Sequence, residues 1–301
     1  GADILRLWVA QSDYTADLRI GPEILKGVSD SYRRLRNTMR FILGSLSEPT
    51  ESEKIEPKDM PELEQWVLHR LSELDERVRK GYTEYDFQGV FQSVFTFATV
   101  ELSSFYFDIR KDVLYCDGDT LERRSARSVL DHIFVRLTAW LAPVLVFTME
   151  EVWLERYPGD ESSIHLTDMP STPKTWLNEE LAKKWTVIRQ ARRAVTAALE
   201  LQRTDKVIGS SLEASPVVYL EDHETFDLLK SIPFSDICIT SSIKLSLDKA
   251  PEEAFSTEEV KGIKVDFQVA SGEKCQRCWK ILPEVTTSNP ICGRCDEALK
   301  G

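Results

Sequence analysis

Apolar residues recur at helical spacing through the first half of the chain. Over residues 22–46 they fall at steps of three and four, which predicts an amphipathic helix with one buried face. The same spacing predicts further helices, and polar segments punctuated by Pro or Gly separate them. Several long amphipathic helices joined by short loops indicate a helical bundle over residues 1–160.

Individual residues suggest the limits of these helices. Asp59, followed by Pro61 and Glu62, predicts an N-cap and a first turn after a polar loop over 47–59, and Gly81 is expected to end that helix. The next helix is expected over 85–108, and its many aromatic residues favour a core position over a cofactor site. Two more helices are expected over 121–142 and 147–157.

The pattern changes after residue 158. A Pro-containing linker leads to a helix over 178–204, and then come short strand-like runs over 215–220, 237–240 and 263–269, with a short helix over 223–231. Residues 161–270 therefore read as a helix plus a small α+β domain. The predicted fold class is mainly α.

Four cysteines near the end of the chain have the spacing of a metal site. Two Cys-x-x-Cys pairs, Cys275 with Cys278 and Cys292 with Cys295, are separated by thirteen residues. Four thiolates make the closed tetrahedral shell of one structural zinc ion, with no open position for a substrate. A disulfide pair and an iron site with the same ligands are the alternatives. Because the module at 271–301 has few apolar residues, we expect metal binding to supply most of its folding free energy.

Composition excludes some classes of protein. The chain has 301 residues, 42% of them apolar, without a run long enough to cross a membrane or the pattern of a signal peptide. It does not begin with Met, which suggests a piece of a longer protein. Six cysteines, four of them in metal spacing, fit the reducing cytoplasm, and Cys116 and Cys238 are expected to be inert buried thiols.

Charge is distributed unevenly. A net charge of −12 argues against a general nucleic-acid binder, although a local basic stripe on an acidic body is still compatible with RNA binding. Five residues of the 22–46 helix form such a stripe opposite its apolar face: Lys26, Arg33, Arg36, Asn37 and Arg40. The last four are the candidate RNA contacts. Periodicity alone leaves two readings open, an RNA contact or ion pairs with acids of a neighbouring helix.

Catalytic patterns are missing from the sequence. There is no glycine-rich phosphate loop, and the four His residues are scattered without a Ser or Cys partner that would suggest a triad. No catalytic residue is therefore expected.

Several segments of the chain resemble bacterial isoleucyl-tRNA synthetases. The matching segments are GADILRLWVA at 1–10, SYRRLRNTMRF at 31–41, FYFDIRKDVLY at 105–115, LAP at 141–143, EEVW at 150–153, VIGSSLEA at 207–214 and EKCQRCW at 273–279 with ICGRC at 291–295. The resemblance covers essentially the whole chain. The last two segments separate it from the valyl and leucyl relatives, which share the helical domain.

This resemblance implies the C-terminal part of a class I aminoacyl-tRNA synthetase. The parent enzyme joins isoleucine to its tRNA at the expense of ATP, but its HIGH and KMSKS signatures and its editing insert are absent here, so this piece alone is expected to be inactive. Its implied partners are the anticodon stem-loop of tRNA(Ile) and the catalytic domain of the parent chain. Nothing demands more than a monomer.

The resemblance also favours the RNA reading of the arginine stripe. At the metal-anchored turn, a second group of residues could stack on or attract RNA: Trp279, flanked by Arg277 and Lys280, with Arg294 on the second turn. Trp279 could instead be a hydrophobic plug beneath the zinc turn. The alternative function for the whole chain is a zinc-stabilised protein-interaction module without an RNA role.

Overall fold

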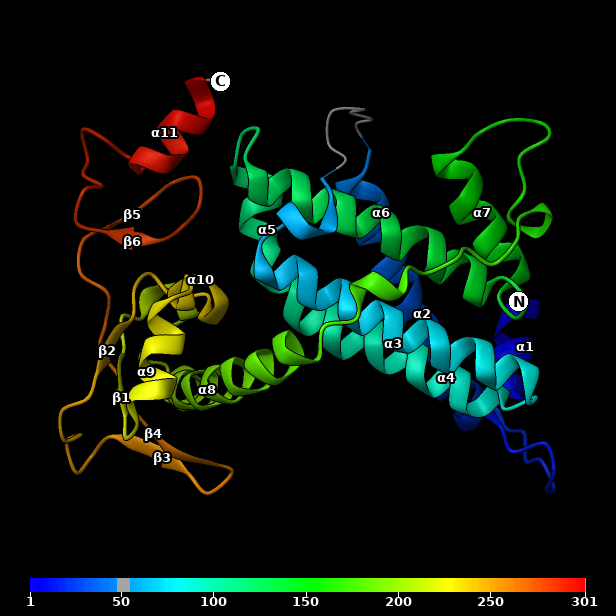
Figure 1. Cartoon of the computed structure of the whole chain (residues 1–301), viewed down its shortest axis with the longest axis horizontal. Helices are drawn as coiled ribbons and strands as arrows, with labels where there is room; N and C mark the ends of the chain where they lie inside the picture. Colours follow the sequence, from blue (N-terminus) through cyan, green and yellow to red (C-terminus); the bar gives the residue numbers. More distant parts are fainter. Residues whose placement is uncertain (48–54, 301) are drawn as a thin grey trace. The chain divides into compact units, whose positions relative to one another are not determined.

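The computed structural model describes residues 1–47 and 55–300. They form two compact units (Figure 1). The first comprises residues 1–114 and 120–178, and the second comprises residues 115–119 and 179–301. The domain boundaries expected at 160 and 270 stay predictions. Most of the loop expected over 47–59 lies outside the described residues, apart from a 3₁₀ turn at Pro57–Asp59.

The first unit is a bundle of helices, as the apolar spacing predicts. In chain order they are α1 (Ala2–Gln11), α2 (Pro22–Ser45), α3 (Glu62–Thr83), α4 (Phe87–Thr96), a π-helical segment (Phe97–Tyr106), α5 (Phe107–Cys116), α6 (Leu121–Leu141) and α7 (Val146–Arg156). Helix α2 packs against α1, α6 and α7, and α3 packs against α4 and α6 (Figure 1). The buried face of α2 consists of Val28, Leu35, Thr38, Met39, Ile42 and Ser45. The mainly α fold class is confirmed.

Both expected limits of α3 are wrong. The helix begins at Glu62 with Pro61 as its N-cap and no side-chain cap, so Asp59 does not cap it. It continues past Gly81 to Thr83. A Cβ at Gly81 would lie 2.4 Å from Cγ2 of Val90 on α4. Glycine is present here because two helices approach closely, which is a packing requirement rather than a stop signal.

The aromatic helix is longer than expected. A π-helical segment interrupts it, and α5 then continues to Cys116 instead of ending at Asp108. Arg110, which follows the expected end of this helix, lies within α5 and is buried. Its Nε and Nη2 donate to the fully buried Glu64 at 2.7 and 2.6 Å. The Tyr106 hydroxyl donates to the same carboxylate at 3.0 Å. Paired in this way, the buried charges are tolerated in the core.

The linker after α7 contains two short 3₁₀ turns, Ile164–Leu166 and Lys174–Trp176. Arg136, buried in α6, donates to Thr172 Oγ1 at 2.8 Å and to the Ser171 carbonyl at 2.6 Å. Further along, the backbone N–H of Asn178 donates to Nδ1 of the buried His69 at 2.9 Å. The polar composition that marks a linker thus serves to attach this segment to the bundle.

The second unit combines a long helix with a small mixed sheet. Its elements are α8 (Glu179–Thr204), a 3₁₀ turn (Ser211–Glu213), β1 (Val217–Leu220), α9 (His223–Lys230), α10 (Phe234–Cys238), β2 (Lys244–Ser246), β3 (Phe255–Thr257), β4 (Val260–Asp266), β5 (Glu273–Lys274), β6 (Ile281–Leu282) and α11 (Gly293–Lys300). The larger sheet has the order β2-β1-β4-β3, with β1 parallel to β2 and the other pairs antiparallel. Helix α8 packs on β3 and β4, and α9 packs on β1 and β2.

The strand expected over 237–240 is wrong. Residues 234–238 form the short helix α10, which ends at Ile239 in a left-handed conformation with φ +58°. The strand that pairs with β1 is β2, formed by residues 244–246. The apolar run was too short for its periodicity to distinguish a strand from a buried helical turn.

No helix within the described residues is long and apolar enough to cross a membrane.

Candidate metal centre and nucleic-acid interface

A short hairpin positions the first cysteine pair. Strands β5 and β6 pair Glu273 with Leu282 and Lys274 with Ile281, and the tight turn between them carries Cys275 and Cys278. The Cys275 N–H donates to the Lys280 carbonyl at 2.9 Å, and the Trp279 N–H donates to the Cys275 carbonyl at 3.0 Å. These bonds close the turn, so both sulfurs point to the same side.

The second pair sits at the start of α11. Cys292 precedes the helix and Cys295 lies in its first turn, where the Asp296 N–H donates to the Cys292 carbonyl at 2.9 Å. The Cys292 N–H in turn donates to Sγ of Cys275 at 3.3 Å, which links the two pairs. One pair therefore comes from a hairpin turn and the other from a helix start.

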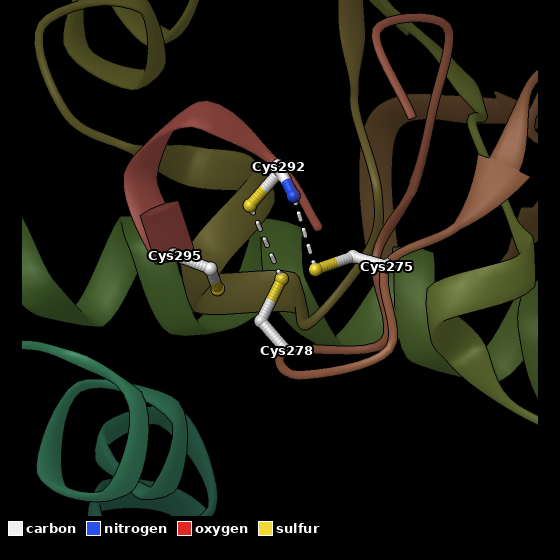
Figure 2. A group of neighbouring side chains, drawn as sticks. All are labelled: Cys275, Cys278, Cys292 and Cys295. Carbon is white, nitrogen blue, oxygen red and sulfur yellow. Dashed lines mark hydrogen bonds between the residues drawn. The ribbon is translucent and has the colours of Figure 1, made fainter. Parts of the chain in front are cut away.

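All four sulfurs converge on one point (Figure 2). They lie within 4.8 Å of one another and all four residues are buried. The Sγ atoms of Cys278 and Cys292 are 3.7 Å apart. That separation fits the edge of a tetrahedron, about 3.8 Å, implied by Zn–S bonds of about 2.3 Å. The donor set and spacing fit one structural zinc ion, as the sequence predicts.

Backbone donors prepare one sulfur for metal binding. Burial alone would raise the pKa of the Cys275 thiol, but N–H groups of Cys278, Cys292 and Arg277 donate to its sulfur and lower that pKa to about 6. Burial raises the pKa of Cys278 to about 11, although the Lys280 N–H opposes the shift. Because zinc binds the thiolate, these N–H groups favour the form that the metal needs.

Trp279 follows the first cysteine turn in an unusual conformation. Its φ is +67°, in the left-handed region that a bulky residue rarely adopts. The side chain is 60% exposed, so it is not a plug beneath the zinc turn. Lys274 places its Nζ over the indole ring, 5.4 Å from the centroid. The zinc turn thus presents an aromatic face beside a cation.

The three cations predicted around Trp279 have intramolecular partners. Lys280 Nζ lies 2.6 Å from Asp236, Arg294 Nη1 lies 3.4 Å from Asp117, and Arg277 Nη1 donates to the Cys295 carbonyl at 3.5 Å. An RNA role for Arg277, Lys280 and Arg294 stays a prediction. Lys274, which the sequence did not single out, is the exposed cation that accompanies the ring.

The two remaining cysteines are buried thiols. Cys116 lies among the metal cysteines, and its Sγ donates to the Arg277 carbonyl at 3.7 Å. Cys238 is fully enclosed, and burial raises the pKa of its thiol well above the usual range. None of these six cysteines, all of them described residues, forms a disulfide.

The arginine stripe of α2 faces solvent. Arg33, Arg36, Asn37 and Arg40 are all exposed. Arg33 pairs with Asp30 one turn away at 2.9 Å, and both side chains are at least half exposed, so that pair is weak. Within the described part of the chain, Arg36 and Arg40 form no ion pair. Among the described residues, no acid of a neighbouring helix therefore pairs with these two arginines, and their RNA role stays a prediction.

A cavity of about 620 Å³ adjoins this stripe in the first unit. Arg36, Asn37 and Arg40 line it from α2, and Glu151, Glu155 and Arg156 line it from α7. Sequence reasoning could not combine these residues, because a contact between two helices more than a hundred positions apart leaves no periodic signal. Only the packing of α2 on α7 brings them together.

Two protein-family models match parts of this chain. Residues 64–218 match the family model described as the anticodon-binding domain of tRNA ligase, which covers just over half of the chain. The chain belongs to this anticodon-binding family. Residues 272–298, which contain all four metal cysteines, match a second family, the zinc finger found in FPG and IleRS.

Individual relatives of this anticodon-binding chain are isoleucine–tRNA ligases. The ligase of Ruegeria pomeroyi is 67% identical over 99% of this chain and 31% of its own length. That of Brucella abortus is 52% identical over 95% of this chain and 29% of its own length. The chain thus spans about a third of the curated relatives it matches. A solved ternary complex of LeuRS, tRNA and LeuAMS from Agrobacterium radiobacter K84 matches 59% of this chain and 20% of its own, at 15% identity and a TM-score of 0.46.

Proposed function

We propose that this chain binds the anticodon stem-loop of tRNA(Ile) as the RNA-recognition part of an isoleucine–tRNA ligase. The intact ligase joins isoleucine to that tRNA with ATP, and this part holds the anticodon end while another domain acts on the acceptor end. Membership in the anticodon-binding family and identity of up to 67% with isoleucine–tRNA ligases support the proposal.

The observation that carries the proposal is the exposed stripe on α2. Arg36 and Arg40 are exposed, one helical turn apart, and without an ion pair among the described residues. On a chain with a net charge of −12, two exposed guanidinium groups beside Asn37 are a local attraction for phosphate. A phosphate that contacts them displaces no ion pair with any residue that the structure describes.

The zinc module contributes a stacking surface in this proposal. Trp279 offers an exposed ring that the cysteine turn holds in place, and Lys274 lies over that ring. Stacking of one base on an aromatic side chain is worth about 1–3 kcal/mol and needs little sequence specificity. We place the protein in the cytoplasm as a monomer, consistent with its free cysteines.

A salt titration of RNA binding tests the proposal. The affinity of the chain for the tRNA(Ile) anticodon stem-loop should fall linearly with salt on a log–log plot. In the double variant Arg36→Glu/Arg40→Glu the slope should become shallower by about 1.4, because two single-strand phosphate contacts are lost at about 0.7 each. Affinity at low salt should fall as well.

The matched control is Lys183→Glu/Arg203→Glu on α8. It reverses two charges that are already paired within their own helix, with Glu180 and Glu200. This control should keep the wild-type slope. If the chain does not bind the stem-loop even at low salt, or if both variants behave alike, the RNA proposal fails and a protein-interaction role becomes the better reading.

A further inference from the structure

Opposite charges line the two walls of the cavity between α2 and α7. Arg36 and Arg40 line one wall, and Glu151 and Glu155, both exposed, line the other. No ion pair joins the two walls among the residues that the structure describes. Both sets of groups therefore remain available to a ligand.

Arg156 has a different role in the same cavity. Its Nη2 lies 2.5 Å from Asp131, its Nη1 donates to the Leu46 carbonyl at 3.2 Å, and its guanidinium lies 5.5 Å from the Phe134 ring centroid. These contacts use its donors and fix its position. Arg156 thus forms a rigid wall, whereas Arg36 and Arg40 are the cations that can bind a ligand.

Charge chemistry limits what this cavity accepts. Two carboxylates would repel a free phosphate, and two guanidiniums would repel a simple cation. A nucleotide carries both complementary features: a phosphate anion for the arginines and, on some bases, an amino group that donates to a carboxylate. The volume of about 620 Å³ falls in the range typical of small-molecule pockets.

We propose that this cavity receives one unpaired loop nucleotide of the tRNA whose base carries an exocyclic amino group. Glu151 or Glu155 accepts from that amino group, Asn37 hydrogen-bonds to the same base edge, and Arg36 and Arg40 hold the adjoining phosphates. Uracil presents carbonyl oxygens at the corresponding positions, so the carboxylates reject it. This inference rests on the proposed RNA-binding function and adds the reading of a base to it.

Removal of single amino groups from the RNA tests this inference. Stem-loops are prepared with inosine in place of guanosine, purine riboside in place of adenosine, or zebularine in place of cytidine, at one loop position at a time. At one position the chain should lose about tenfold in affinity, the discrimination typical of one specific base contact. The variant Glu151→Ala/Glu155→Ala should bind the stem-loops with and without that amino group with equal affinity.

The control separates base reading from general electrostatics. Glu84→Ala removes an exposed carboxylate of the same unit outside the cavity and should leave the tenfold discrimination intact. If Glu151 and Glu155 only repel RNA, the double variant will bind every stem-loop more tightly by the same factor, and the inference is overturned. A third outcome is that the Arg36→Glu/Arg40→Glu variant loses RNA affinity while no single amino group of the RNA affects binding. In that case the base-reading inference fails and the RNA-binding proposal survives. If the wild-type chain binds no stem-loop at all, both the inference and the RNA-binding proposal are overturned.

Discussion

Trp279 adopts a backbone conformation that is unfavourable for a residue with a bulky side chain. Its left-handed conformation, with φ +67°, costs a non-glycine residue about 1–2 kcal/mol. Its ring is mainly exposed, so the fold recovers little of that energy through burial. A strained residue that the surrounding turn holds in an exposed position is a reason to look for a functional role.

Two substitutions separate the backbone of Trp279 from its ring. Trp279→Gly removes both the strain and the ring, whereas Trp279→Ala removes only the ring. We expect the glycine variant to bind zinc about fivefold more tightly than the alanine variant, because about 1 kcal/mol of strain is relieved in the metal-bound fold. Competition with a chromogenic chelator measures this ratio. Both variants should lose the same stacking contribution to RNA affinity, and unequal loss would contradict the stacking role.

Sequence predicts exposure at the residue scale better than it predicts partners. Helical periodicity correctly placed Arg36 and Arg40 on the solvent face of α2. It could not show that Arg110 pairs with Glu64 or that Lys280 pairs with Asp236, because each acid lies more than forty positions away. The four metal cysteines were predictable because their ligand spacing is local within each pair.

At the element scale, Gly81 makes the contact between α3 and α4 possible. Gly81→Ala would place a Cβ 2.4 Å from Val90 Cγ2, and the resulting overpacking should destabilise the first unit by about 1–3 kcal/mol. The matched control is Gly27→Ala on α2, where a Cβ would meet nothing within 4 Å. There alanine should stabilise the helix by about 0.5–1 kcal/mol. Urea denaturation followed by far-UV circular dichroism measures both, and equal effects would refute the packing role.

Elements with a sustained period were predicted well, and short ones were not. The helices α2, α6 and α8 begin and end within about two residues of their expected limits because 20 or more residues carry the apolar pattern. The segment over 234–238 carries too few residues for any period, and tertiary contacts decide its helical form. Gly81 misled because its close approach to Val90 on α4 is a packing requirement. Asp59 misled because it ends a 3₁₀ turn, and Pro61 takes the N-cap position of α3 instead.

Zinc removal tests how far the metal stabilises the final elements. A strong chelator should abolish hydrogen-exchange protection in residues 273–300 while the helices of the first unit keep theirs, because the module has few apolar residues beside its cysteines. Elemental analysis should find one zinc ion per chain. Cys292→Ala should lose the metal, and Cys238→Ala should retain it because Cys238 lies outside the cluster. Retention of both metal and protection in the Cys292 variant would contradict a four-cysteine site.

At the scale of the whole molecule, the proposed RNA contacts are small surfaces on a chain with a net charge of −12. Since that net charge repels RNA at long range, the proposal requires local attraction at groups such as Arg36, Arg40 and Trp279. Composition alone therefore argued against the function that family membership supports. The spatial distribution of a few cations carries more information about RNA binding than their sum.

A competition assay tests whether these 301 residues bind tRNA(Ile), as proposed. Added to an aminoacylation reaction of a complete isoleucine–tRNA ligase, the chain should inhibit by sequestering tRNA, and excess tRNA should relieve the inhibition. The Arg36→Glu/Arg40→Glu variant should inhibit much less. The chain alone should give no ATP–pyrophosphate exchange above background, since that step needs a nucleotide site. Exchange by the chain itself, or inhibition that added tRNA does not relieve, would show that its action is not confined to holding tRNA.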